Sequence, residues 1–187
     1  MTLIRVLLPT LVVLCFVVTP KSRATLESQV RVQATPITTC DVRGFVVDQD
    51  PQGLNVRLGP GQDHAVIGNL PYAADTGVGV HISGSSGSWM RIDLAFEEGT
   101  DNERTLFKGV GWVYGPLIGL TGMAVKNGGT PLYQEAASRA RLVTSVPGGE
   151  SVIVKGCRGK WLFVEYKNVT GWAAPQTLCA NSLTTCV

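Results

Sequence analysis

The chain has 187 residues, enough for one large domain or two small ones, and its 16 Lys+Arg against 14 Asp+Glu give a formal net charge of +2. Binding to a nucleic-acid backbone requires clustered positive charge, and the sequence holds no such cluster, so we expect no nucleic-acid partner. The 22 glycines and 10 prolines count against long helices.

The N-terminus has the pattern of an export signal. Arg5 precedes an apolar run over Val6–Val18, which fits the roughly 7–15-residue core of a signal peptide and is shorter than the ~20 residues of a spanning helix. Small residues suited to cleavage follow at Ser22–Ala24, and Val32–Ala34 is a second candidate. We expect residues 1–24 to be a signal peptide, with no stable membrane span after cleavage; an uncleaved anchor is the alternative.

Export changes the charge and predicts the location of the mature protein. Loss of residues 1–24 removes three basic side chains and leaves 13 Lys+Arg against 14 Asp+Glu. The mildly basic character of the whole chain is therefore partly a property of its signal. We expect a secreted or periplasmic protein.

Four of the five cysteines lie after the predicted signal. They are Cys40, Cys157, Cys179 and Cys186. An even number of cysteines behind an export signal indicates disulfides, for which three connectivities are possible. Zinc is the competing reading, but no pair has C-x-x-C spacing and the only histidines are His64 and His81, so we expect no metal site and no cofactor.

Residues 25–39 are polar and are predicted to be a linker, after which short apolar alternations begin at Arg43. Two of these alternations are clear, and their apolar members are Val78, Val80 and Ile82, then Met90, Ile92 and Leu94. Period-two runs separated by turn residues predict short antiparallel strands in a barrel or sandwich. The one helix-like stretch, Gln134–Leu142, lacks a sustained apolar stripe and is predicted to be a loop.

Two segments of the chain repeat one another around tryptophans. Trp89 and Trp161 each open an apolar alternation and lie 72 residues apart, whereas Gly111–Val113 and Gly171–Ala173 lie 60 apart. The two spacings differ by twelve residues, which locates an insertion in the first repeat, near residues 96–108. Self-similarity at this length indicates two copies of one supersecondary unit.

The first repeat opens with the octet Leu54–Gly61, Leu-Asn-Val-Arg-Leu-Gly-Pro-Gly. We predict that its three apolar residues, Leu54, Val56 and Leu58, alternate inward and that Gly59–Gly61 forces a turn. Arg57 faces outward and can bond carbonyls of the neighbouring loop. This octet, with the tryptophan segments, resembles bacterial SH3-like domains, which are small β-barrels that bind rather than catalyse.

The resemblance implies an all-β protein of two tandem SH3-like small β-barrels after the signal peptide. The first would span residues 40–120, with the insertion near 96–108, and the second 124–187, where the octet itself is missing. In that fold Cys157 ends the second strand and Cys179 lies on the last one, which implies a Cys157–Cys179 pair. By exclusion Cys40–Cys186 would be the other disulfide.

A binding groove is also implied by the resemblance, lined by one strand aromatic, one tryptophan and one proline per barrel. By this transfer the groove residues are Phe45, Trp89 and Pro116 in the first repeat and Tyr133, Trp161 and Pro175 in the second. Trp89 and Trp161 can equally be core residues. Trp112 and Trp172 each follow a glycine within a strand, and we expect both in the core.

No catalytic constellation is found, because the only candidate bases, His64 and His81, are both explained by surface positions on a turn and a strand. We therefore expect a non-enzymatic exported binding module, and the resemblance implies cell-wall peptidoglycan or its peptides as ligand. The alternative is a secreted interaction or inhibitor protein that contacts an envelope protein through the acidic insertion at 96–108. A solvated hairpin is the simpler interpretation of that insertion.

Overall fold

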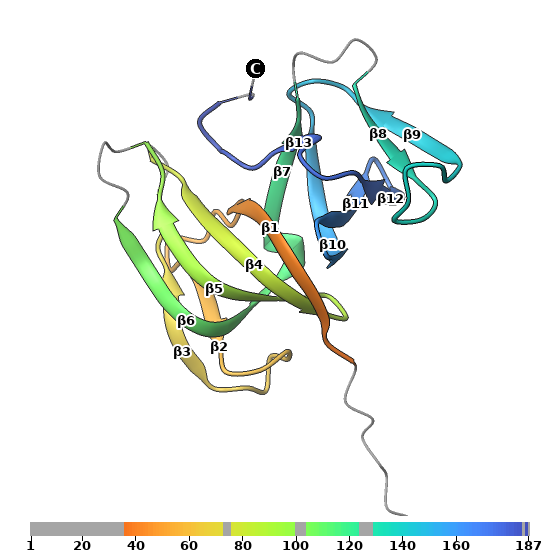
Figure 1. The fold of residues 1–187 in the computed structure, drawn as a ribbon. Helices are drawn as coiled ribbons and strands as arrows, with labels where there is room; N and C mark the ends of the chain where they lie inside the picture. The colour runs from red at the N-terminus through yellow and green to blue at the C-terminus, as the bar shows by residue number, and fades with distance from the viewer. Residues whose placement is uncertain (1–35, 73–75, 100–103, 124–128, 185, 187) are drawn as a thin grey trace, which may run out of the picture. The chain divides into compact units, whose positions relative to one another are not determined.

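Alternating segments and turn residues build 13 strands in the part of the chain that the structure describes. The structure, a computed structural model, covers residues 36–72, 76–99, 104–123, 129–184 and 186 in describable form (Figure 1). The predicted signal peptide, residues 1–24, lies outside this part, as does most of the predicted linker. Among the described residues, no helix has the length and hydropathy needed to cross a membrane.

The strands fall on either side of a short 3-10 helix, Gly115–Leu117. Before it come β1 (Thr38–Val46), β2 (Leu54–Arg57), β3 (Val66–Leu70), β4 (Val78–Ser86), β5 (Trp89–Glu97) and β6 (Thr105–Tyr114). After it come β7 (Ile118–Gly122), β8 (Thr130–Tyr133), β9 (Leu142–Val146), β10 (Ser151–Arg158), β11 (Trp161–Tyr166), β12 (Val169–Ala173) and β13 (Leu178–Cys179). The predicted loop over Gln134–Leu142 is confirmed up to Arg141.

All of these strands belong to one antiparallel sheet. Its order is β3-β2-β6-β5-β4-β1-β7-β10-β11-β12-β8-β9, and β13 pairs with β7 beside this path. The all-β class is confirmed. The division into two barrels at 40–120 and 124–187 stays a prediction, because β7 crosses the predicted boundary and pairs with β1 on one side and β10 on the other.

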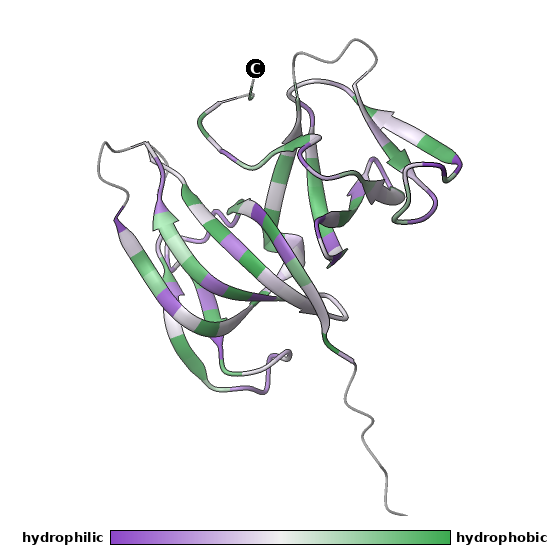
Figure 2. Cartoon of the chain, in the orientation of Figure 1, coloured by the Kyte–Doolittle hydropathy of each residue, from purple (hydrophilic) through white to green (hydrophobic). Residues whose placement is uncertain are grey.

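One cluster of buried apolar side chains includes residues from both predicted repeats. In β4, Val78, Val80 and Ile82 are all buried, as their alternation predicts. Their polar neighbour His81 lies on the opposite face of the strand and is only partly covered. Figure 2 shows the resulting alternation of hydrophobic and hydrophilic bands along the strands.

In β5 the alternation changes phase. Met90 and Ile92 are fully buried as expected, but Ala95 rather than Leu94 is the next fully buried residue. The pairing of β5 with β6 shifts its register between Ile92 and Leu94. Such a bulge moves the following side chains to the other face, which the sequence pattern alone does not show.

The octet behaves largely as its residue types predict. Its first two apolar side chains are buried in β2, and Arg57 Nη1 donates to the carbonyls of Gln62 and His64, both at 2.9 Å. The predicted role of Arg57 is therefore confirmed. The inward placement of Leu58 is wrong, because β2 ends at Arg57 and Leu58, 65% exposed, already belongs to the turn.

The two tryptophans predicted to be core residues, Trp112 and Trp172, differ in burial. Trp112 is 4% exposed, so its assignment is confirmed. Trp172 is only half-buried, because Gly171 and Ala173 beside it take the inward face of β12. It packs instead against Phe163, with ring centroids 5.1 Å apart, so a core position is wrong for Trp172.

The four cysteines after the predicted signal all form disulfides, but the implied pairing is wrong. The bonds are Cys40–Cys157 and Cys179–Cys186. Cys40 reaches Cys157 because β1 forms an isolated parallel bridge to Gly159, just after β10, which brings the two Cα atoms within 5.8 Å. Cys179 pairs through β13 with β7, and the chain then turns back so that Cys186 meets it.

Candidate binding site

Of the six predicted groove residues, the structure brings two into ring contact. Tyr133 at the end of β8 and Trp161 at the start of β11 meet edge to face, with centroids 6.1 Å apart. Both are half-buried, so each keeps one exposed side. Pro175 lies on the connection between β12 and β13, where it lines a separate pocket.

The three predicted groove residues of the first repeat are dispersed. Phe45 is 7% exposed in β1, and Trp89 packs against its cross-strand partner Tyr114, with centroids 5.5 Å apart. Pro116 lies in the 3-10 helix and is half-buried. Because Phe45 points into the protein, it offers little surface for a groove shared with Trp89.

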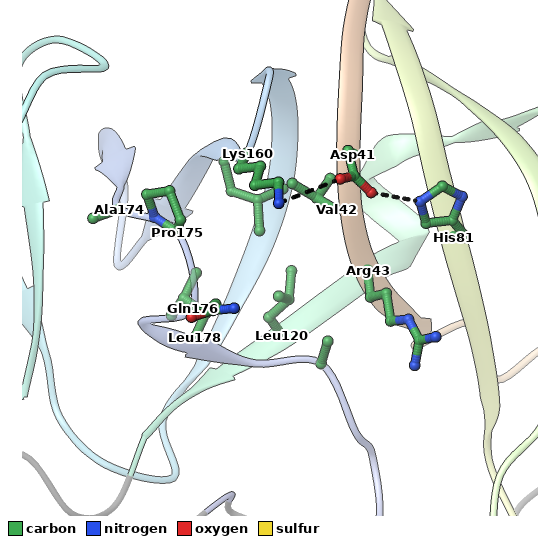
Figure 3. Close-up of a pocket in the computed structure, with 12 residues that line it drawn as sticks. Asp41, Val42, Arg43, His81, Leu120, Lys160, Ala174, Pro175, Gln176 and Leu178 are labelled. Carbon is green, nitrogen blue, oxygen red and sulfur yellow. Dashed lines mark hydrogen bonds and ion pairs between the residues drawn. The ribbon is translucent and has the colours of Figure 1, made fainter.

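A pocket of about 310 Å³ lies where β1 and β4 face the turns that flank β11 and β12 (Figure 3). Its polar lining comes from both sides of the central strand β7. The lining includes Asp41, Arg43, His81, Lys160, Pro175 and Gln176. The apolar part is formed by Val42, Leu120 and Leu162, which are buried, together with Leu178.

A local clamp positions the two sides of this pocket. The amide of Asp41 donates to the carbonyl of Gly159 at 2.9 Å, and the amide of Gly159 donates to the carbonyl of Thr39 at 2.9 Å. The Cys40–Cys157 disulfide closes the same junction covalently. Since Lys160 follows Gly159 directly, the clamp places its side chain beside Asp41.

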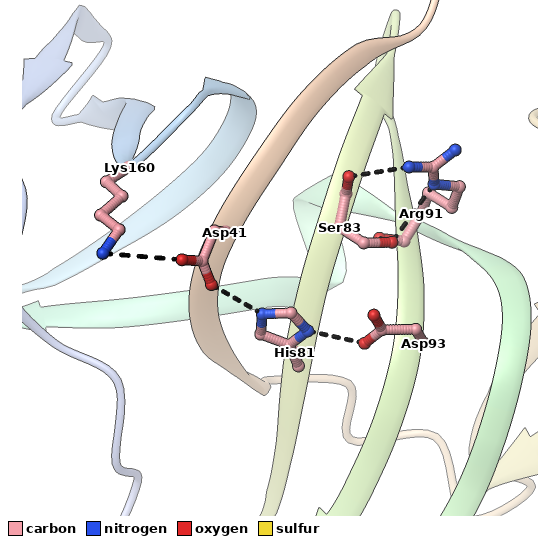
Figure 4. A network of polar contacts seen from close by, with 6 residues as sticks. All are labelled: Asp41, His81, Ser83, Arg91, Asp93 and Lys160. Carbon is pink, nitrogen blue, oxygen red and sulfur yellow. Dashed lines mark hydrogen bonds and ion pairs between the residues drawn. The ribbon is translucent and has the colours of Figure 1, made fainter.

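A chain of charged groups runs from β5 to Lys160 (Figure 4). His81 Nδ1 lies 2.6 Å from Asp93 Oδ1, and His81 Nε2 lies 3.1 Å from Asp41 Oδ1. The other oxygen of Asp41 lies 3.7 Å from Lys160 Nζ. One carboxylate thus serves both an imidazole and an ammonium.

These contacts shift two pKa values in opposite directions. Partial burial lowers the pKa of His81, but the hydrogen bonds to Asp93 and Asp41 outweigh it, so the pKa lies above its ordinary value of 6.5. The hydrogen bond from His81, followed by the charge of Lys160, holds the pKa of Asp41 below its ordinary value of 3.8. The protonated imidazole is therefore the favoured partner of both carboxylates.

The wall opposite β1 is a tight turn with a residue in the left-handed region. Gln176 has φ 58°, an uncommon conformation for a residue other than glycine. Thr177 holds the turn closed, since its hydroxyl donates to the carbonyl of Ala174 at 2.7 Å and its own carbonyl accepts from the hydroxyl of Thr130. The backbone strain at Gln176 is maintained by these bonds, and such strain is concentrated at functional sites.

The acidic insertion makes contacts within its own chain. Glu97 accepts hydrogen bonds from Arg104 Nε at 2.7 Å and from the Thr76 hydroxyl at 2.9 Å. Both bonds lower the pKa of Glu97 below its usual value, and the charge-assisted bond from Arg104 has the larger effect. Glu98 is 3% exposed and accepts from the amide and the hydroxyl of Ser182, at 2.9 and 2.5 Å. The hairpin between β5 and β6 is confirmed, but Glu98 is a buried anchor for the C-terminal segment rather than a solvated side chain.

Sequence reasoning missed most of the pocket. Asp41, Arg43, Lys160 and Gln176 carry no local motif, and His81 was assigned only a surface position. The available signal was weak. Asp41 and Arg43 flank Val42 in an alternating strand, which indicates that both point outward but does not show which segment they face. Among the described residues, no group of three or more His, Cys, Asp or Glu side chains is arranged to hold a metal ion.

Comparison with known proteins identifies one part of the chain. Residues 128–178, from just before β8 to the start of β13, match the family described as Bacterial SH3 domain. This segment is a bacterial SH3 domain. It contains Tyr133, Trp161 and the pocket wall at Lys160 and Gln176. With the two disulfides it is consistent with an extracytoplasmic protein.

The other comparisons add little. A search of curated proteins found no match. Among solved structures, the chain is similar to one titled "Structure of NlpC2 from Trichomonas vaginalis", with 12% sequence identity and a TM-score of 0.29. The similarity covers 78% of this chain and 49% of that one, so the chain spans about half the length of that protein. The SH3-like assignment of residues 40–120 stays a prediction.

Proposed function

We propose that the protein is an exported, non-enzymatic binding module for cell-wall peptidoglycan or its peptides. The observation that carries this proposal is that the bacterial SH3 domain at 128–178 supplies one wall of the 310 Å³ pocket. Bacterial SH3 domains often bind peptidoglycan. A concave site with an apolar base and a few converging polar groups is the usual form of a small-ligand site.

The geometry of His81 supports a binding role rather than a catalytic one. A general base needs a ring nitrogen free to accept a proton from the reacting group. In His81 both nitrogens already face carboxylates, Asp93 at 2.6 Å and Asp41 at 3.1 Å. The imidazole therefore acts as a bridge between β5, β4 and β1.

The alternative function, partner capture through residues 96–108, receives no comparable support. Two of its four acidic residues, Asp101 and Glu103, lie outside the described residues. The other two, Glu97 and Glu98, bind groups of this chain. We retain this alternative only as one outcome of the test.

The test is co-sedimentation of the purified protein with isolated bacterial sacculi. We expect the protein to pellet with sacculi, as an established wall-binding protein does in the same buffer, and to stay in solution without them. A variant that lacks residues 100–103 shortens the insertion outside the described strands, and we expect it to pellet equally. Failure of the intact protein to pellet refutes the proposal and leaves the alternative, whereas failure of the shortened variant alone would place the wall contact in the insertion instead of the pocket.

A further inference from the structure

The pocket contains a cation, Arg43, that pairs with no carboxylate among the residues that the structure describes. Its guanidinium lies 5.5 Å from the centroid of the Phe96 ring. Arg43 is exposed, and in Figure 3 it stands on the opposite side of the pocket from Pro175 and Gln176. A guanidinium stacked on an aromatic ring is held in place while its donors stay available to a ligand.

A second cation in the pocket is weakly held. Lys160 Nζ lies 3.7 Å from Asp41, and both side chains are about two-thirds exposed, at 65% and 64%. An exposed pair at this distance contributes little stability. Asp41 also has its closer bond to His81, at 3.1 Å, so Lys160 can turn to another anion at small cost.

The charge of the pocket fits one negative group. The charge of His81 is balanced by Asp93, 2.6 Å away, so Arg43 and Lys160 against Asp41 leave a net charge of +1 among the lining side chains. A carboxylate carries one negative charge, whereas a phosphate monoester carries about 1.5 to 2 at pH 7 and would be only partly compensated. Gln176, fixed on its strained turn, adds an amide group with two donors.

The apolar side of the pocket limits what can accompany that carboxylate. Val42, Leu120 and Leu162 form a buried base that favours a small aliphatic group. The volume of about 310 Å³ is near the lower end of the roughly 300–1,000 Å³ usual for ligand sites. These properties together describe the end of a short peptide with a small apolar residue and a free carboxylate.

We propose that the pocket binds the free α-carboxylate end of a short peptide, with Arg43 and Lys160 as the charge partners and Gln176 as a further donor. This inference rests on the proposed function, because cell-wall peptides are the expected source of such ends. It adds to that function a defined site and a defined chemical group. Of the groove residues implied by the family resemblance only Pro175 lines this pocket, and Tyr133 and Trp161 do not, so the site is not that groove.

The experiment compares two ligands that differ only in the charge of their end. Calorimetric titration of the full protein uses N-acetyl-Lys-D-Ala-D-Ala with a free carboxylate and the same peptide as its C-terminal amide. Hydrogen bonds to a charged group are worth about twice those of a neutral one, so we expect the amide to bind roughly 10–100-fold more weakly. Arg43→Gln and Lys160→Gln should each weaken only the binding of the free acid.

Matched controls use cations outside the pocket. Arg139→Gln and Lys108→Gln change exposed residues that do not line it, and both should leave the affinity unchanged. Equal urea midpoints for all four variants confirm that the fold is retained. A loss of affinity in the controls as large as in the pocket variants would show non-specific attraction and overturn the inference.

The outcomes separate this inference from the proposed function. If the protein pellets with sacculi but binds acid and amide equally, or binds neither, the carboxylate site is wrong and wall binding stands. If the free acid binds and depends on Arg43 and Lys160, but the protein does not pellet with sacculi, the site is supported and the wall function is refuted.

Discussion

The disulfide between Cys40 and Cys157 should be the larger covalent contribution to stability. It closes a loop with a sequence separation of 117, whereas Cys179–Cys186 closes one of only 7. The chain-entropy relation gives upper values of about 4.9 kcal/mol for the long loop and about 2.4 kcal/mol for the short one at 25 °C. Each pair has one fully buried sulfur residue, Cys157 at 3% and Cys179 at 1%, so the packing losses are similar.

The perturbations are the paired variants Cys40→Ala/Cys157→Ala and Cys179→Ala/Cys186→Ala. Urea unfolding at pH 7, followed by fluorescence of the four tryptophans, measures the free energy of unfolding of each against the intact protein. We expect the first variant to lose about 2.5 kcal/mol more than the second. If the first variant does not fold under conditions in which the second does, the predicted order of the two losses is supported without a value for the first. Equal losses, or a larger loss from the short loop, would refute the argument from loop length.

Three further predictions concern single side chains. The pKa of His81 is raised in the folded state, so its contribution to the free energy of unfolding is fully present below about pH 6.5 and is lost as pH rises through the folded-state pKa. The difference in unfolding free energy between the intact protein and His81→Gln should therefore shrink from pH 5.5 to 8.5. Glu98→Gln removes the charge from two hydrogen bonds to Ser182 and should speed amide exchange at Ser182 by roughly 10-fold or more, measured by mass spectrometry. Trp112→Ala should cost about 3–5 kcal/mol of unfolding free energy, and Trp172→Ala less, because Trp172 is only partly buried.

Each of these has a result that contradicts it. A constant difference between the intact protein and His81→Gln over the pH range would mean that the imidazole gains nothing from its carboxylates. Exchange at Ser182 that stays at the native rate would show that the C-terminal segment is held without Glu98. Equal losses for Trp112→Ala and Trp172→Ala in urea unfolding would mean that burial does not decide the cost.

The candidate site was only partly predictable. Tyr133 and Trp161, two of the six residues that the family resemblance implied for a groove, are in ring contact within the segment that matches the bacterial SH3 domain, and their role in binding stays a prediction. The pocket residues Asp41 and Lys160 were missed since they lie 119 positions apart and neither has a motif around it. Their approach depends on the bridge between β1 and the turn after β10, a contact that no local pattern encodes.

Local interactions in the sequence determined the strands, most of the turns, the outward role of Arg57 and the burial of Trp112. These depend on alternation, turn residues and short-range hydrogen bonds, all of which act between neighbours in the chain. The tertiary structure alone decided the disulfide pairing, the phase of β5 after its bulge, the burial of Glu98 and the joining of both repeats through β7. Each of these is a contact between distant segments, and its energy depends on which strands become neighbours once the whole sheet has formed.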